Sequence, residues 1–102
     1  MSNESQANRC IIDGELIELE TLRYTPAGVP RMALKLKHAS LQQEAGMARK
    51  VECDIPAIAL DKAALAVSKM QQGQQVRAEG FLAQRSMRST QLILHIDNIN
   101  LR

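Results

Sequence analysis

The sequence predicts an all-β domain, a five-stranded Greek-key barrel with one short helix between its third and fourth strands. Three observations lead to this prediction. The chain has 102 residues, the size of one small domain. Apolar and polar residues alternate over five separate stretches, as they do in strands with one buried face. A single further stretch has helical spacing. Because aromatic residues are 2% of the chain, we expect a core of aliphatic side chains.

The first strand is expected over residues 10–19. Apolar positions of one face run from Cys10 to Leu16, and the alternation changes phase at Ile17. A change of phase close to Gly14 predicts a β-bulge or a strong bend in this strand.

The second strand, residues 31–37, has the clearest alternation in the chain. It follows a turn over residues 25–30, where two prolines and a glycine favour chain reversal. Met32, Leu34 and Leu36 are expected to face the core. The opposite face carries Arg31, Ala33, Lys35 and Lys37. Residues 39–47 are polar and are expected to form a loop.

The third strand is expected over residues 50–55, with Val51, Cys53 and Ile55 facing inward. Pro56 is expected to end this strand and to begin a helix, because proline is tolerated in the first helical turn. Residues 57–70 are mostly good helix formers. One helical face would then hold Leu60, Ala64 and Val67.

Two further strands complete the prediction, over residues 76–82 and 92–101. The inward residues are Val76, Ala78, Gly80 and Leu82, then Leu92, Leu94, Ile96, Ile99 and Leu101, with an interruption at Asp97 and Asn98. A polar turn over residues 84–91 joins the two strands. This order of elements fits a barrel of the OB type, a fold that binds oligonucleotides on the face of strands 2 and 3. We expect one domain over residues 9–102, preceded by a polar tail over residues 1–8.

Most other classes of protein are excluded by what the sequence lacks. It has no phosphate-binding glycine loop, no metalloprotease motif and no nucleophile elbow, so we expect no enzymatic activity and no cofactor. His38 and His95 have no nucleophile beside them and are expected at the surface or an interface. Cys10 and Cys53 lie far apart and are expected to be buried, reduced thiols without a metal, as in a cytoplasmic protein. Because residues 1–8 are polar, we expect no secretory signal, and because no apolar stretch approaches about 20 residues, we expect no membrane-spanning helix.

The net charge of +2 conceals a strongly basic middle of the chain. Residues 23–50 carry six cationic side chains against one carboxylate. Three of these cations alternate along the second strand, about 6.6 Å apart for each two-residue step, a spacing that can follow the backbone of an extended nucleic acid. Arg85 and Arg88 would add a second cationic group. The alternative is a solvated strand face that only prevents aggregation.

Two rings are available for stacking, Tyr24 in the loop after the first strand and Phe81 on the outer face of the fourth. Single-strand binders commonly stack bases on aromatic rings. Because this chain has only two such rings, we expect its affinity to depend mainly on phosphate contacts and to fall as salt is added. Phe81 has an alternative role as an apolar plug or subunit contact. Ile11 and Ile93 also point outward, which favours self-association through a two-fold dimer.

Three segments resemble one known family. They are Arg23 to Pro30 (RYTPAGVP), Leu36 to His38 (LKH) and Ser40 to Gly46 (SLQQEAG), and together they resemble the primosomal replication protein N, or PriB, family. The stretch from Gly73 to Leu82 is similar to strand 4 of bacterial single-stranded DNA-binding proteins. The resemblance covers residues 9–101.

This resemblance implies an OB-fold homodimer that binds single-stranded DNA and acts without catalysis at stalled replication forks, with the PriA helicase and DnaT as partners. The DNA contacts that it implies are Arg23, Thr25, Lys37, Lys50, Arg85 and Arg88; our charge and ring arguments add Tyr24, Arg31, Lys35 and Phe81. Met47 and Glu52 stand where family members carry aromatic residues. This difference favours an alternative, a protein-interaction module of the same fold with weak or lost DNA affinity. An RNA-binding OB domain is a third interpretation.

Overall fold

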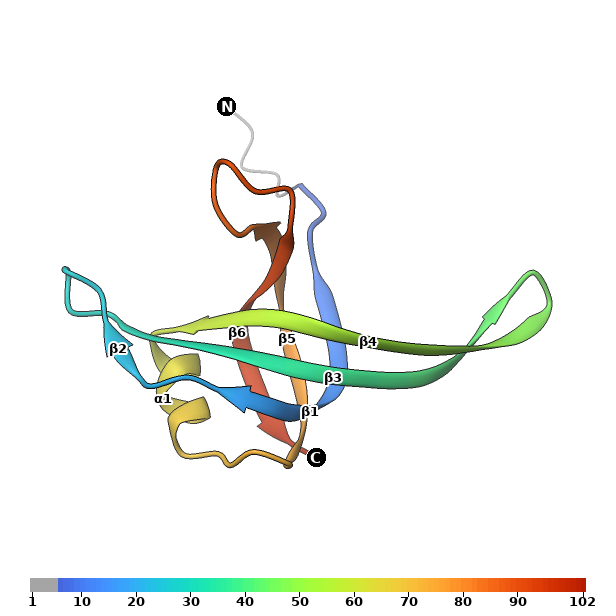
Figure 1. Cartoon of the computed structure of the whole chain (residues 1–102), viewed down its shortest axis with the longest axis horizontal. Helices are drawn as coiled ribbons and strands as arrows, with labels where there is room; N and C mark the ends of the chain where they lie inside the picture. Colours follow the sequence, from blue (N-terminus) through green and yellow to red (C-terminus); the bar gives the residue numbers. More distant parts are fainter. Residues whose placement is uncertain (1–5) are drawn as a thin grey trace.

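The computed structural model describes residues 6–102, in which five long strands close into a barrel (Figure 1). β1 pairs with both β5 and β3, so the order β1-β5-β6-β4-β3 closes on itself, and the short β2 adds to β3. Neighbouring strands are antiparallel except β4 and β6, which run parallel. This confirms the predicted OB-type barrel with a single short helix. The elements are β1 (Cys10–Leu19), β2 (Arg23–Tyr24), β3 (Pro30–Glu44), β4 (Met47–Leu60), α1 (Lys62–Ser68), β5 (Gln75–Gln84) and β6 (Leu92–Leu101).

The core is aliphatic, as the composition predicts. The largest fully buried side chains are Leu16, Leu36, Leu94, Val67 and Val76. They come from four strands and from α1, which covers one end of the barrel (Figure 1). Some residues expected to face inward lie instead at the rim of the barrel, where nothing covers them; these are Leu82, Leu92 and Leu101.

Both irregularities expected in the strands are present. The register of β1 against β3 shifts between Leu16 and Glu18, which is the bulge that the change of phase predicts. β6 is continuous through Asp97 and Asn98, but its register against β5 shifts between Glu79 and Gly80. The predicted interruption is therefore a bulge within one strand.

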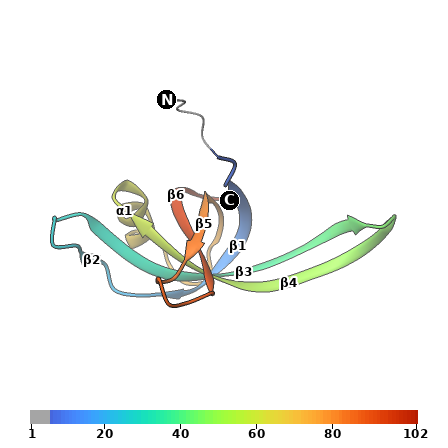
Figure 2. The same cartoon turned by 90° about the horizontal axis from the view of Figure 1, so that it is seen from above.

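The predicted loop over residues 39–47 is wrong. β3 continues to Glu44 and pairs with β4 along its whole length, so residues 40–51 form a two-stranded hairpin arm beyond the barrel (Figures 1 and 2). Only Ala45 and Gly46 lie in the turn, both with positive φ (51° and 77°), as a tight two-residue hairpin requires. Both faces of the arm are largely exposed, so its strands need no apolar alternation.

Pro56 does not end the third predicted strand, which runs on to Leu60. The N–H of Asp61 donates to the carbonyl of Pro30 on β3, at 2.9 Å. Successive backbone nitrogens of a strand point alternately to its two edges. Since Pro56 lies an odd number of residues before Asp61, its nitrogen points away from β3 and toward β6, and pairing with β6 begins only at Ala57. The proline therefore removes no hydrogen bond from the sheet.

The helix is shorter than the predicted range of 57–70. Ala57, Ile58 and Ala59 are buried in β4 between β3 and β6, and this burial overrides their helical propensity. Leu60 ends the strand and is 40% exposed, so it does not share a helical face with Ala64 and Val67.

The expectation of buried thiols is also wrong. Cys53 is exposed, because it lies at the base of the hairpin arm where no element packs over that face of β4, and Cys10 is half-buried. Both are free thiols.

Part of the predicted N-terminal tail, residues 1–5, lies outside the described residues. Asn8 pairs with the backbone of Leu82 through two hydrogen bonds, of 2.8 and 2.9 Å. Between residues 6 and 102, no helix is long and apolar enough to cross a membrane.

Candidate nucleic-acid interface

The outer face of β3 carries the predicted row of cations. Met32, Leu34 and Leu36 are buried, so the alternating residues Arg31, Lys35 and Lys37 point out of the barrel. Arg31 and Lys37 are exposed, whereas Lys35 is half-buried and forms an ion pair with Glu18 on β1, at 3.5 Å. The alternation thus places the charges correctly but does not foresee that one of them is already paired.

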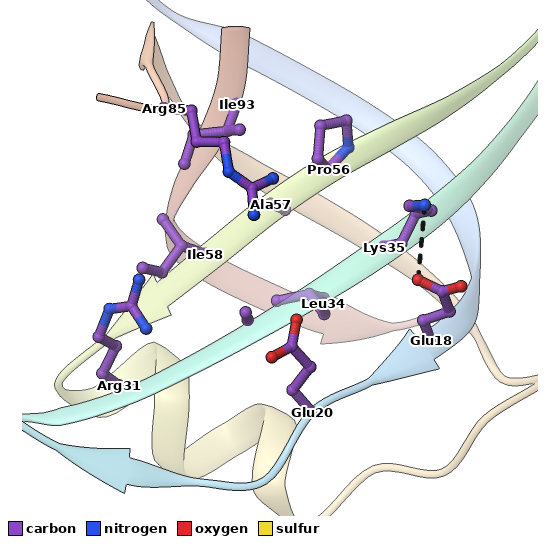
Figure 3. Close-up of a pocket in the computed structure, with 11 residues that line it drawn as sticks. Glu18, Glu20, Arg31, Leu34, Lys35, Pro56, Ala57, Ile58, Arg85 and Ile93 are labelled. Carbon is purple, nitrogen blue, oxygen red and sulfur yellow. Dashed lines mark ion pairs between the residues drawn. The ribbon is translucent and has the colours of Figure 1, made fainter. Parts of the chain in front are cut away.

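A groove of about 340 Å³ lies over the outer face of β3 and β4 (Figure 3). We call it the β3–β4 groove. Its side chains combine apolar residues of the sheet with charges at its edges: Glu18, Glu20, Arg31, Ala33, Leu34, Lys35, Pro56, Ala57, Ile58, Arg85 and Ile93. A polyanion with apolar bases can use both parts, because phosphates bind the cations and bases contact the apolar floor.

Arg85 reaches this groove from the β5–β6 loop. The N–H of Arg85 donates to the carbonyl of Gln91 at 2.9 Å, which closes the base of the loop. Arg85 and Arg31 therefore come from segments far apart in the sequence and line the same cavity (Figure 3). Arg88 is exposed further along the loop and does not line it.

Arg23 extends the cationic surface on the other side of β3. It lies directly opposite Arg31 in the pairing of β2 with β3. Both side chains are exposed, and no ion pair involves either of them in the part of the chain that the structure describes. Because like charges placed opposite one another destabilise a strand pair, this arrangement favours an anion bound between them.

Lys37 and Lys50 lie on the same outer face but outside the groove. Lys37 is directly opposite Asp54 on β4, and Lys50 is opposite Leu41 on the hairpin arm. Glu52 follows two residues after Lys50 on the same face. The cationic surface along β3 and β4 is therefore interrupted by carboxylates before it reaches the end of the arm.

The loop before β3 holds Tyr24 and Thr25 differently. Tyr24 is 63% exposed and pairs with Pro30, so its ring is free for contact beside the cations of β2 and β3. Thr25 is engaged in the turn: its Oγ1 accepts a hydrogen bond from the N–H of Val29 at 3.1 Å. Thr25 thus shapes the loop that presents Tyr24.

Phe81 is on the outer face of β5, as predicted, but it already has an aromatic partner. Its ring stacks on that of His95, its neighbour on β6, with centroids 5.0 Å apart and planes at 12°. A smaller cavity of about 290 Å³ next to this pair includes Asp61, Lys62 and Asp97. Phe81 therefore does not line the β3–β4 groove, although Ile58 borders both cavities.

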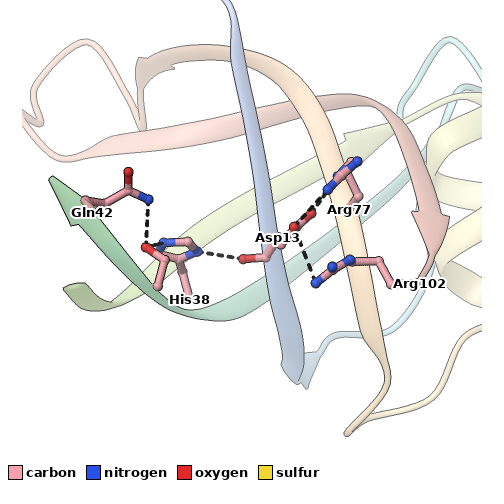
Figure 4. Close-up of polar contacts among 6 residues, drawn as sticks. Asp13, His38, Gln42, Arg77 and Arg102 are labelled. Carbon is pink, nitrogen blue, oxygen red and sulfur yellow. Dashed lines mark hydrogen bonds and ion pairs between the residues drawn. The ribbon is translucent and has the colours of Figure 1, made fainter. Parts of the chain in front are cut away.

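Two ion-pair clusters hold the barrel together away from the groove. Arg9 makes a bidentate contact with Asp97, at 2.6 and 2.9 Å, and this hydrogen bonding lowers the pKa of the Asp97 carboxyl below its ordinary value. Asp13 likewise has a lowered pKa, first because Arg77 hydrogen-bonds to it and second because Arg102 lies nearby (Figure 4). These arginines are therefore occupied by carboxylates.

His38 is half-buried and is part of a hydrogen-bond chain beside the second cluster. Its Nδ1 lies 2.7 Å from the carbonyl oxygen of Asp13, and its Nε2 lies 2.8 Å from Oγ of Ser40 (Figure 4). Because a carbonyl can only accept, Nδ1 carries the proton. Among the described residues, no three His, Cys, Asp or Glu side chains are grouped so that they could hold a metal ion.

Sequence reasoning missed half of the groove. Glu18 and Glu20 arrive from the end of β1, and Pro56, Ile58 and Ile93 supply its floor. For Ile93 the sequence predicts only an outward apolar side chain. Pro56 and Ile58 could have been assigned to the outer face by extending the alternation of the third strand. The prediction of a helix over residues 57–70 prevented this assignment.

Comparison with solved structures supports this fold closely. PriB from Ralstonia solanacearum superposes with a TM-score of 0.86 and 34% identity, over 95% of this chain and 99% of that one. A deletion mutant of the single-stranded DNA-binding protein from Thermus aquaticus superposes with a TM-score of 0.74 and 22% identity, over 94% of this chain and 50% of that one. The second likeness concerns the fold alone.

Sequence comparison agrees. A family model described as another single-strand binding protein family matches residues 8–98. The replication restart protein PriB of Nitrosomonas europaea is 40% identical over 89 residues, which are 87% of this chain and 82% of that protein. PriB of Neisseria meningitidis serogroup A is 46% identical over 78 residues, covering 76% and 77%. None of these relatives is named as an enzyme. On this evidence, the chain belongs to the PriB family of replication restart proteins.

Proposed function

We propose that this protein binds single-stranded DNA during replication restart and acts as a non-catalytic adaptor that stimulates the restart helicase. The observation that carries the proposal is the β3–β4 groove, where Arg31 and Arg85 line an apolar floor. The partners that family membership suggests are the PriA helicase and DnaT. No cofactor is involved, and the protein works in the bacterial cytoplasm, where replication forks lie.

Binding divides between phosphates and bases. Arg23, Arg31 and Arg85 are exposed cations that can each bind a phosphate, and Lys35 can do so when it leaves Glu18. Lys37, Lys50 and Arg88 extend the path along the outer face. Bases lie on the floor of the groove, and Tyr24 stacks a further base at the edge of β2. Phe81 contributes only if its stacking on His95 opens.

This mode of binding predicts a steep dependence on salt. Six exposed cations of the proposed path form no ion pair among residues 6–102: Arg23, Arg31, Lys37, Lys50, Arg85 and Arg88. We take four of them to contact phosphates at one time. With four phosphates neutralised, the slope of log K against log salt is about −3, so affinity falls about 50-fold between about 50 and 200 mM salt. Fluorescence anisotropy of a labelled single strand, over a series of salt concentrations, measures this fall in affinity. A flat salt dependence, or no binding at the lower salt, contradicts the proposal.

We propose further that two copies associate through the free edge of β1. The N–H of Leu16 donates to Gln74 just before β5, so even-numbered residues of the first half of β1 point their backbone groups toward β5. Ile11 and Asp13 point the other way, where β3 pairs only from Glu15 onward. Because the carbonyl of Asp13 already lies 2.7 Å from Nδ1 of His38, the free part of this edge is at Ile11. Ile11 is also 61% exposed. An open strand edge with an exposed apolar side chain favours pairing with another chain.

Dimerisation can be checked by sedimentation equilibrium. The expected mass is twice the 11.3 kDa of the chain, and Ile11→Asp is expected to return the protein to the monomer mass because it places a charge in the seam. Leu41→Asp, at a residue 65% exposed on the hairpin arm, is the matched control and leaves the dimer intact. A monomeric wild-type protein would disprove this part of the proposal.

One observation favours the alternative, a protein-interaction module with little DNA affinity. Glu52 and Asp54 lie on the outer face beside Lys50 and Lys37, and Met47 stands at the tip of the arm, 72% exposed. These carboxylates repel phosphates, whereas a protein partner can pair with both signs of charge. An RNA-binding role would instead appear as preference for an RNA strand over a DNA strand of the same sequence.

A further inference from the structure

One carboxylate in the β3–β4 groove has no partner. Glu18 pairs with Lys35, but the side chain of Glu20 forms no ion pair or hydrogen bond with any residue from 6 to 102. Its backbone is held in place, since the N–H of Glu20 donates to the carbonyl of Ala33 at 3.0 Å. The structure thus places an exposed carboxylate, on a held backbone, among the residues that line a groove proposed to bind a polyanion.

The groove has two chemically different sides. β1 lies beside β3 and β6 beside β4, so residues from β1 and from the β5–β6 region border the groove from opposite sides. Figure 3 shows Glu18 and Glu20 on one side, with Arg85 and Ile93 on the other. Between them lie Ala33 and Pro56, both half-buried, which offer contact to the flat face of a base.

A carboxylate at this position repels phosphate, so it does not help to bind the backbone. It can accept hydrogen bonds from the edge of a base, as Asp and Glu accept from the exocyclic N4 amino group of cytosine. Uracil and thymine have a carbonyl oxygen at this C4 position instead, so a carboxylate that faces C4 is repelled, even though the neighbouring N3–H is a donor. The same side chain thus favours one pyrimidine and disfavours the other.

We propose that Glu20 is a specificity-determining residue, which makes the groove prefer cytosine to uracil and thymine. A base on the floor of Ala33 and Pro56 directs its amino edge to Glu20, while its phosphates lie toward Arg31 and Arg85. This inference rests on the proposed function, because it requires a single strand in the groove.

The test compares two strands that differ only at C4 and N3 of the base. Short oligonucleotides of deoxycytidine and deoxyuridine have the same size and backbone and both lack the thymine methyl, and mildly alkaline pH keeps cytosine unprotonated. By fluorescence anisotropy at low salt, the wild-type protein is expected to bind the cytosine strand about five- to tenfold more tightly than the uracil strand. This ratio is about what one hydrogen bond to a base edge contributes at a solvent-exposed site. With Glu20→Ala the two affinities become equal, because the uracil strand gains affinity and the cytosine strand does not. Glu20→Gln, which can both donate and accept, leaves a reduced preference.

Glu52→Ala is the matched control. It removes one negative charge from the same outer face but outside the groove, so it raises affinity for both strands and keeps their ratio. Equal affinity of the wild-type protein for the two strands, or a ratio that Glu20→Ala does not change, overturns the inference and leaves the proposed function standing. Failure to bind either strand at low salt overturns the proposed function, and the inference with it.

Discussion

Replacing Arg31 and Arg85 together by glutamate is expected to weaken binding of single-stranded DNA about 100-fold or more at low salt. Each guanidinium loses a charge-assisted hydrogen bond to phosphate and is replaced by a repelling carboxylate, and about 1.4 kcal/mol per site is tenfold. The slope of log K against log salt should also become shallower by about 1.4, as two fewer phosphates are neutralised. Fluorescence anisotropy over a salt series measures both.

The matched control reverses two exposed lysines near the ends of α1, Lys62→Glu and Lys69→Glu, which changes the net charge equally but away from the groove. Its affinity should change only slightly. Unwinding of a forked duplex by PriA, with and without each variant, then separates the two functions. Lost binding with lost stimulation supports the DNA-dependent adaptor; unchanged binding by Arg31→Glu with Arg85→Glu contradicts it, and unchanged stimulation despite lost binding favours the protein-interaction module.

The second large effect is expected from Gly80→Ala, on stability. A Cβ at this position would lie 1.8 Å from the carbonyl oxygen of His95 and 2.7 Å from its carbonyl carbon. Both atoms belong to the backbone of β6 at the bulge between β5 and β6, so no side chain can move to make room. We expect a loss of about 3 to 5 kcal/mol in the free energy of unfolding, a large part of the stability of a small domain. Urea denaturation measures it.

Gly14→Ala is the graded comparison for this variant. Its Cβ would lie 3.0 Å from the carbonyl oxygen of Lys37 and 3.3 Å from Cβ of Leu36, contacts that a small shift relieves. Gly14→Ala should lower the free energy of unfolding by clearly less than Gly80→Ala, about 1 to 2 kcal/mol. Equal effects of the two substitutions would mean that the approach of β6 to Gly80 does not limit the barrel.

Alternation made much of this barrel predictable. Met32, Leu34 and Leu36 are buried and their neighbours are not, because a strand with one face against a core must alternate. The bulge in β1 was also readable, since a bulge transfers the apolar positions from one parity to the other. The cations of β3 could be assigned to the outer face for the same reason.

Alternation did not predict the strands in two regions: where both faces of a strand are exposed to solvent, and where both faces are buried. The hairpin arm is exposed on both faces, so its strands read as a polar loop. Ala57, Ile58 and Ala59 are three consecutive buried residues, so they show no alternation, and their propensities favour a helix. Pro56 would end most strands, and only the direction of its nitrogen, away from β3, makes it harmless.

The sequence by itself determined the fold class, the aliphatic core, the outward row of cations and the family resemblance, because these depend on local alternation and on ordered motifs. Only the tertiary structure decided which charges act together. It joined Arg85 to Arg31, paired Lys35 with Glu18, left Glu20 free in the groove and stacked Phe81 on His95. Each of these contacts joins different strands, or a strand and a distant loop, and only closure of the barrel sets their distances.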